Sequence, residues 1–337
     1  MTANIVDVAR RAGVSTASVS RVLNGNYPVS EDVRRRVLEA VRDLGYVGNA
    51  HARALLKSTS GTVGVILHDV SDPYFAEIVR GVQEVAGLED RLVVICNSLR
   101  EPGREITYIE MLRAHRVDAV IMAGGHIMDD EYVMALREQA LQLRAQGSRL
   151  VLCGRHPVRA DAVVPDNTVG AARLVRHLLA AGHRRIAHIS GPPELSTTRD
   201  RLEGYLGALA SYGLDADPAL IVPGEFSRDG GYGGVGCLLD SGAEFTAVFA
   251  ANDLTAVGAI ARLHERGLRV PEDISVAGFD DVPVAGDVTP PLTTVRVPMV
   301  EMGRQSMRLA LREPAAPYEV VRLETELVVR KSVSSLT

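Results

Sequence analysis

Near the amino terminus, apolar residues recur at every third or fourth position, which is the spacing of amphipathic helices. This pattern predicts a helix from Ile5 to Ala12, followed by a turn at Gly13. A second helix, capped by Ser15, is expected to end near Asn24, and a third is expected over Glu31–Leu44. Three short helices of this kind predict a small helix-turn-helix head.

From Thr62 onward, short apolar runs alternate with helical stretches. Strands alternating with helices are typical of doubly wound parallel sheets. About 275 residues of this pattern are too many for one sheet, so we expect an α/β body with two lobes after the all-α head. The predicted strands are Val63–Leu67, Leu92–Cys96, Ala119–Met122, Leu150–Cys153, Ile186–Ile189, Ala247–Ala250 and Ile274–Phe279. The predicted helices include Tyr74–Ala86, Thr168–Ala181, Arg199–Ser211 and Leu254–Arg266.

The second predicted helix has one apolar face and one unusually smooth face. Val19, Val22 and Leu23 are expected to point inward. The opposite face is small and uncharged except for one arginine, which suits a helix that lies in the major groove of DNA. An ordinary helical hairpin is the alternative interpretation. The residues of the smooth face are Thr16, Ala17, Ser20, Arg21 and Asn24.

The charge distribution supports contact between the head and nucleic acid. The chain has 337 residues, a hydrophobic fraction of 46% and a net charge of −5. Residues 1–60 carry nine Lys and Arg against five Asp and Glu, a net charge of +4. The remainder carries 28 against 37, a net charge of −9. A basic head on an acidic body indicates that only the head meets phosphate.

Several other classes of protein are disfavoured by the sequence. No apolar run reaches transmembrane length, and the amino terminus has a helix-turn-helix pattern instead of a signal sequence, so we expect a cytoplasmic protein without membrane contact. Cys96, Cys153 and Cys237 lie far apart, and no His/Cys cluster has metal spacing. No nucleophile with a matching base is evident. We therefore expect neither a metal, nor a cofactor, nor catalysis.

Polar residues follow the predicted strands, where parallel sheets bind ligands. In a two-lobed body this edge faces the cleft, so these groups suit a polar or polyhydroxylated small molecule. Carboxylates at strand ends also cap helices, and we expect Asp253 to do so and Asp281 to be structural. Gly230–Gly236 is glycine-rich but lacks the pattern of a phosphate-binding loop, so we interpret it as the start of a helix.

The chain resembles the LacI/GalR family of bacterial transcription regulators over essentially its whole length. The density and order of the matching stretches make the resemblance specific. They include VDVARRAGVSTASVSRVLN, VSEDVRRRVLEAVRDLGYVGNAHARAL, VGVILHDVSDPYFAEIVRGVQ, DNTVGAARLVRHLLAAGHRRIAHISG, FAANDLTAVGAIARLHERGLRVPEDISVAGFDD and PPLTTVRVPMVEMG.

The resemblance implies a homodimer whose paired heads bind a pseudo-palindromic double-stranded operator. It implies base-reading roles for Thr16, Ala17 and Arg21. In such relatives the linker becomes a hinge helix on DNA and wedges a leucine into the minor groove, a role that falls here to Leu55. The full set of implied DNA-binding residues is Ser15, Thr16, Ala17, Ser20, Arg21, Asn24, Arg53 and Leu55.

The resemblance also implies an effector site between the lobes. Tyr74 and Phe75 match an aromatic pair, Arg201 an arginine that commonly grips the effector, and Asp280 an acceptor for ligand hydroxyls or amines. The full set of implied effector-binding residues is Tyr74, Phe75, Arg155, Thr197, Arg201, Phe226, Asn252 and Asp280.

We therefore expect three parts. Residues 1–47 would form the DNA-binding domain, residues 48–60 the hinge, and residues 61–337 a periplasmic-binding-protein-like body. Its amino-terminal lobe would span about 61–162 and 293–320, and its carboxyl-terminal lobe about 163–292 and 321–337.

Two departures from the family pattern affect these expectations. Gly48 stands where proline is frequent, which predicts a looser hinge. The segment 126–146 looks longer than usual and would modify either the rim of the cleft or the dimer face.

The resulting hypothesis is a transcriptional repressor whose operator affinity is controlled by a small ligand, a sugar or sugar derivative, bound between the lobes. The short polar tail predicts a dimer instead of a tetramer. A solute-binding protein with the same body is the alternative, which the missing signal sequence and the head disfavour.

Overall fold

The computed structural model describes residues 3–24, 29–46 and 60–336. The chain forms two compact units, Met1–Ser60 and Gly61–Thr337. The expectations for Gly48, Arg53 and Leu55 lie outside the described residues, as does the linker up to residue 59.

The first unit contains the three predicted helices, α1 (Ile5–Ala12), α2 (Thr16–Asn24) and α3 (Glu31–Asp43). Asn4 caps α1, because its Oδ1 accepts hydrogen bonds from the backbone N–H groups of the first turn, and Gly13 ends that helix at a φ of 64°, as predicted. The inward stripes of the three helices pack together around residues that are fully or nearly fully buried. That core contains Val8, Ala9, Ala12, Val19, Val37 and Ala40, with Val22, Leu23, Val33, Val41 and Leu44 packed against it.

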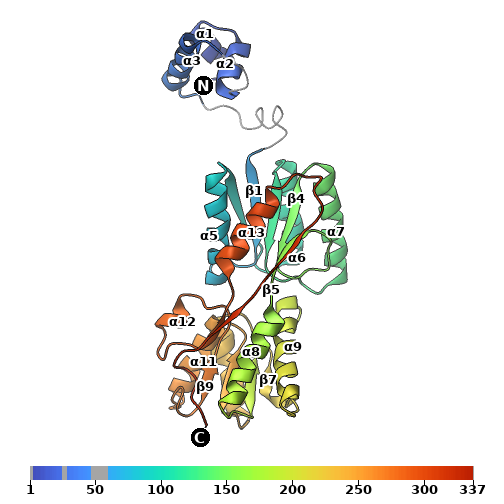
Figure 1. Cartoon of the computed structure of the whole chain (residues 1–337), viewed down its shortest axis with the longest axis vertical. Coiled ribbons are helices and arrows are strands. Elements are labelled where there is room, and N and C mark those ends of the chain that lie inside the picture. The colour runs from blue at the N-terminus through green and yellow to red at the C-terminus, as the bar shows by residue number, and fades with distance from the viewer. Residues whose placement is uncertain (1–2, 25–28, 47–59, 337) are drawn as a thin grey trace. The chain divides into compact units, whose positions relative to one another are not determined.

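The second unit has two lobes, each built on a parallel sheet (Figure 1). The sheet of the amino-terminal lobe has six strands in the order β11-β5-β4-β3-β1-β2. Apolar strands that are covered on both faces are expected in such a sheet, and β1, β3 and β4 are almost wholly buried. The strands are β1 (Thr62–Leu67), β2 (Leu92–Asn97), β3 (Ala119–Ala123), β4 (Arg149–Cys153), β5 (Asp161–Pro165) and β11 (Val320–Leu323).

Helices cover both faces of this sheet. On one face, α5 (Pro73–Leu88) and α13 (Met299–Ala310) contribute to one apolar core. On the other face, α6 (Pro102–Ala114) and α7 (Asp130–Ala145) contribute to a second core. The sheet therefore forms the middle layer of the lobe.

The carboxyl-terminal lobe repeats this three-layer plan on a sheet of four strands in the order β7-β6-β8-β9. Two helices, α8 (Asn167–Ala180) and α9 (Ser196–Ser211), pack on one face, and α10 (Arg228–Asp240) and α11 (Asp253–Glu265) pack on the other. The strands are β6 (Ile186–Ile189), β7 (Ile221–Val222), β8 (Ala247–Ala250) and β9 (Ser275–Ala277), with the short helices η1 (Pro218–Leu220) and α12 (Val284–Asp287) between elements.

Segments far apart in the sequence connect the lobes. The strands β10 (Thr294–Arg296) and β12 (Glu326–Val328) pair antiparallel between the two main sheets. The chain also crosses between β5 and α8. The expected lobe boundary at residue 162 falls inside β5, and the one at residue 320 falls at the first residue of β11. Both strands belong wholly to the amino-terminal sheet, so this lobe extends a few residues beyond both expected boundaries.

The predicted strands and helices of the body are all present, with ends that differ by a few residues. The glycine-rich stretch Gly230–Gly236 lies in α10, as interpreted from the sequence. Within the described residues, no helix combines the length and the apolar composition needed to cross a membrane.

Candidate functional site

The α2 helix presents a polar surface on a small, well-capped scaffold. The Ser15 hydroxyl accepts a hydrogen bond from the backbone N–H of Ser18 at 3.1 Å, so Ser15 caps α2 as predicted. Thr16, Ala17 and Arg21 are exposed, while Val19 of the same helix is fully buried. The helix therefore exposes one face with a single arginine and anchors the other face in the core.

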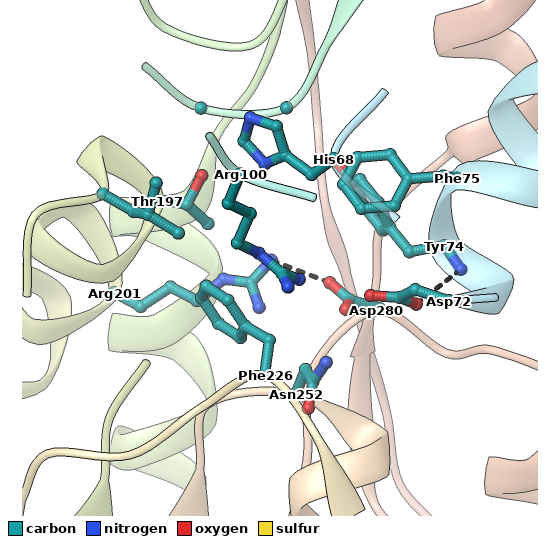
Figure 2. Close-up of a pocket in the computed structure, with 13 residues that line it drawn as sticks. His68, Asp72, Tyr74, Phe75, Arg100, Thr197, Arg201, Phe226, Asn252 and Asp280 are labelled. Atoms are coloured by element: carbon teal, nitrogen blue, oxygen red, sulfur yellow. Dashed lines mark hydrogen bonds and ion pairs between the residues drawn. The ribbon is translucent and has the colours of Figure 1, made fainter. Parts of the chain in front are cut away.

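The second candidate site is a cleft at the carboxyl ends of the body strands. Polar groups from both lobes meet there around a cavity of about 40 Å³ (Figure 2). Seven of the eight predicted effector residues line it, which agrees with the rule that open parallel sheets bind ligands at this edge. The lining residues are His68, Asp72, Tyr74, Phe75, Arg100, Gly124 and Gly125 from one lobe, and Leu195, Thr197, Arg201, Phe226, Asn252 and Asp280 from the other.

Arg201 is buried at the bottom of the cleft and is extensively bound by the protein itself. Its Nε donates to Asn167 Oδ1 at 3.1 Å, and its Nη1 donates to the carbonyl oxygen of Ala251. Its Nη2 donates to Asp280 Oδ1 at 2.7 Å. The guanidinium carbon also lies 3.8 Å from the ring centroid of Phe279. Arg201 is thus fixed in place by four neighbours.

Asp280 is the acidic partner in this buried ion pair. Burial raises the pKa of Asp280 to about 7, and the neighbouring Arg201 guanidinium opposes that shift. Its backbone φ of 106° is unusual for a residue with a side chain. The backbone N–H of Asp280 donates to Val295, and its carbonyl accepts from Val297, so the returning strand holds this conformation.

Aromatic rings form the walls of the cavity. The rings of Tyr74 and Phe75 meet edge to face at 5.1 Å, and Phe75 also contacts His68. Phe226 comes from the opposite lobe and lies above Gly191, where a Cβ would approach the ring to 2.4 Å. These rings give the cleft apolar walls around its central polar groups.

The prediction that Asp253 caps α11 is wrong, because Asn252 performs that task. Asn252 Oδ1 accepts hydrogen bonds from the backbone N–H and the hydroxyl of Thr255. Asp253 instead accepts from the backbone N–H of Val282 and the hydroxyl of Thr294. The Asp253 carboxylate therefore joins the first residue of α11 to the loop that follows β9.

Asp281 is structural, as interpreted from the sequence. Its two carboxylate oxygens pair with Arg296 at 2.8 Å and Arg330 at 2.7 Å. These arginines belong to the segments that link the lobes, so Asp281 holds the connection together.

Arg155 is the predicted effector residue that does not line the cavity. Its guanidinium forms two hydrogen bonds with Asp200, at 3.1 and 2.5 Å. The side chain lies instead on a separate surface groove near Arg159 and Tyr318. The ion pair joins a loop of the amino-terminal lobe to α9 of the other lobe.

The segment 126–146 begins at the rim of the cleft. The backbone N–H of His126 donates to the hydroxyl of Ser196, and the backbone N–H of Ser196 donates to the carbonyl oxygen of His126. The backbone N–H of Met128 donates to the carbonyl oxygen of Glu194 at 2.7 Å. These contacts adjoin Thr197, which lines the cavity. The rest of the segment forms α7, which packs on the sheet.

The structure adds residues that were not predicted to bind an effector. His68 and Arg100 bring ionisable side chains to the cavity. At Gly125 a Cβ would approach Thr197 Oγ1 to 2.4 Å, so glycine permits the close approach of the two lobes. Arg100 could have been predicted from the sequence as a cavity residue, because it follows the predicted strand β2 at the same edge of the sheet.

Comparisons with known proteins find relatives of the head, of the body and of the whole chain. Residues 4–49 match the model of bacterial regulatory proteins of the lacI family. Residues 175–333 match a periplasmic binding protein-like domain. The transcriptional regulator GalR of Escherichia coli strain K12 is 39% identical over 311 residues, which cover 92% of this chain and 88% of GalR. The chain belongs to the LacI family.

Solved structures of the LacI family agree with this assignment. The lac repressor dimer bound to operator and the anti-inducer ONPF matches with a TM-score of 0.86 and 28% identity, covering 99% of this chain and 100% of that one. The complex of the regulator CelR with cellobiose matches with a TM-score of 0.72 and 33% identity, covering 98% and 99%.

The family assignment decides between the functions considered from the sequence. Full-length relatives are transcription regulators, so this LacI-family chain is a DNA-binding regulator and not a solute-binding protein or an enzyme. The match to the lacI-family model lies within the first compact unit, and the match to the periplasmic binding protein-like domain lies within the second.

Proposed function

We propose that this LacI-family regulator reads a pseudo-palindromic operator with the exposed face of α2. Thr16, Ala17 and Arg21 contact bases, and Arg21 donates to a guanine in the major groove. Ser15, Ser20 and Asn24 contact phosphates, while Arg53 and Leu55 enter the minor groove from the hinge. The exposure of the polar side of α2 supports this role, since its apolar side is anchored in the head.

We further propose that residues 1–47 bind DNA, residues 48–60 form the hinge, and residues 61–337 bind the effector and the second subunit. The second subunit covers apolar side chains that lie exposed along one edge of the amino-terminal lobe, where β2 is the outermost strand. These side chains are Leu88, Leu92, Val94, Ile95 and Leu99.

The effector is a sugar or sugar derivative bound in the cleft. Aromatic walls from Tyr74, Phe75 and Phe226 suit the apolar faces of a sugar ring, and Asn252, Asp280 and Thr197 offer partners for hydroxyl groups. CelR, a full-length relative, was solved with cellobiose. Three of the five N–H groups of Arg201 already have protein partners, so Arg201 orients Asp280 and keeps two N–H groups for the effector.

Ligand binding changes operator affinity by changing how the lobes close. The cavity has room for only about three water molecules, which is less than a monosaccharide requires. Ligand entry therefore needs the lobes to part along the connecting segments around β10 and β12. A movement of the two amino-terminal lobes across the dimer would alter the spacing of the heads.

Sequencing of genomic DNA fragments captured by the purified chain tests the operator-reading proposal. We expect enrichment of a discrete inverted repeat. The substitution Arg21→Ala should weaken binding by about 1–3 kcal/mol and relax base preference within each half-site. Arg35→Ala, at an exposed arginine of α3 paired with Asp32, is the matched control and should keep the same motif. Capture without any enriched motif, or an unchanged motif with Arg21→Ala, would contradict this assignment of α2.

A further inference from the structure

Arg100 brings a second guanidinium group to the cleft, from the lobe opposite Arg201. It lies just after β2, and Figure 2 shows its side chain extending from the amino-terminal lobe into the cavity. Unlike Arg201, Arg100 takes part in none of the ion pairs found among the described residues. Its Nε atom is buried and, among those residues, has no hydrogen-bond partner.

The turn that carries Arg100 is held in a defined conformation. Leu99 and Arg100 both have left-handed backbones, with φ of 55° and 60°. Non-glycine residues seldom adopt this conformation, and they do so where the surroundings fix it. The backbone N–H of Ser98 donates to Leu67 at 2.9 Å, and the N–H of Glu101 donates to Ser98 at 3.1 Å.

A buried polar network anchors the same turn to the cavity wall. The hydroxyl of Ser98 donates to Glu105 Oε1 at 3.1 Å, and Tyr132 donates to the other oxygen of Glu105. Nε2 of His68, which lines the cavity, lies 3.3 Å from Oε1 of Glu105. The network therefore ties the Arg100 turn to β1.

The carboxylates of the cleft are already engaged by other groups. Asp280 is paired with Arg201 at 2.7 Å. Asp72 caps α5 by accepting from the backbone N–H of Tyr74 at 3.0 Å, and its interaction with Arg100 is a longer-range attraction. A neutral sugar offers Arg100 only hydroxyl groups. A carboxylate or phosphate offers two oxygens in the geometry that a guanidinium binds best.

We propose that Arg100 makes the cleft selective for an anionic monosaccharide and binds its carboxylate or phosphate. Asp280 accepts hydrogen bonds from the hydroxyl groups of the sugar, and the side-chain amide of Asn252 donates to them. This inference rests on the proposed function, since it specifies the sugar that the cleft takes. Arg100 is thus a specificity-determining residue, while Arg201 holds Asp280 in place.

Matched pairs of sugars test this selectivity on the full-length protein. Thermal melting and calorimetric titration would compare D-glucose, D-galactose and D-ribose with D-glucuronate, D-galacturonate, D-gluconate, glucose 6-phosphate and ribose 5-phosphate, at constant ionic strength. We expect at least one acid to bind where its neutral partner does not. The uronates and the phosphates form separate arms that identify the anionic group.

Variants of Arg100 separate its role from a general effect of charge. Arg100→Gln should weaken binding of the acid by about tenfold or more, because a charge-assisted hydrogen bond is lost. It should leave the melting temperature measured without ligand unchanged. Arg100→Lys should restore part of the affinity. Arg104→Gln, at an exposed arginine one turn further on and paired with Glu101, should bind the acid as the wild type does.

Three results would overturn the inference. These are a neutral sugar that binds as tightly as its acid, an acid that binds Arg100→Gln undiminished, and a panel in which no acid binds. In the first case the proposal that a sugar controls this regulator is kept, and only the proposed selectivity for anionic sugars is wrong. If no sugar of either kind binds, the sugar assignment of the proposed function fails as well, whereas operator capture still tests the regulator separately.

Discussion

Arg201 stabilises the fold, because it neutralises the buried carboxylate of Asp280. Arg201→Ala would leave Asp280 buried without its cation and remove the donors to Asn167 and Ala251. Loss of one partner of a buried ion pair costs about 3–5 kcal/mol. We expect the free energy of unfolding, measured by urea denaturation, to fall by about that amount.

A half-exposed ion pair of the same lobe provides the control. Arg185 pairs with Asp217 at 3.2 Å, and Arg185→Ala should cost less than about 1 kcal/mol. Equal losses from the two substitutions would contradict a special structural role for Arg201.

His188 predicts a dependence of stability on pH. It is buried between the rings of Tyr205 and Phe249, and burial lowers its pKa to about 4. The unfolded chain takes up the proton near the ordinary pKa of about 6.5. The contribution to stability is therefore complete above pH 6.5 and is lost as the pH falls toward 4.

His188→Phe should remove this part of the pH dependence. Between pH 7 and pH 5 the wild type should lose about 1–2 kcal/mol more than the variant in urea denaturation. His264→Gln, at an exposed histidine of α11, should keep the wild-type slope. If His188→Phe retains the full slope, His188 is not a neutral buried group.

Glycines fix how closely helices pack in the body. In α10 a Cβ at Gly231 would approach the carbonyl oxygen of Thr255 in α11 to 1.9 Å, whereas a Cβ at Gly233 has no neighbour within 4 Å. Gly231→Ala should therefore lower the thermal midpoint, at a cost of about 1–3 kcal/mol for overpacking. Gly233→Ala, in the same helix, should be neutral or stabilising by up to about 1 kcal/mol. Similar midpoints for the two variants would show that the helices separate without cost.

The elements found from the sequence are those with strong local patterns. Apolar runs such as Ala247–Ala250 are strands in the structure, because both of their faces are covered by helices. The strand β5 escaped prediction, because it begins with the buried Asp161, which is paired with Arg149. The strands β10 and β12 escaped it too, because each has only three residues and their pairing depends on the return of the chain between the lobes.

The residues that line the cavity were predictable to the extent that they follow strands in recognisable motifs. Tyr74, Arg201 and Asp280 all line the cavity, as the family resemblance implied. The sequence could not indicate that Arg201 has protein acceptors for its donors, or that Arg155 pairs with Asp200 away from the cavity. Those facts depend on how side chains of the two lobes meet.

Dimer formation is a property of the whole molecule that one exposed residue can test. Ile95→Asp places a charge in the proposed apolar interface on β2 without altering the core. We expect sedimentation analysis to show a monomer, and operator affinity to fall about a hundredfold or more, because the two heads no longer bind together. Leu141→Asp, at an exposed residue of α7, should leave the dimer intact. A monomer with Leu141→Asp and a dimer with Ile95→Asp would instead place the interface on the 126–146 segment.

In the proposed function, a ligand bound in the cleft of the body controls how tightly the heads bind the operator. The most direct measurement is the capture of genomic fragments by the purified chain with and without a pool of neutral and acidic sugars, repeated with Phe226→Ala, which removes one wall of the cavity. We expect an inverted repeat whose capture changes when the pool is added to the wild type and changes less with Phe226→Ala. Capture of the same repeat to the same extent with and without every sugar would contradict it.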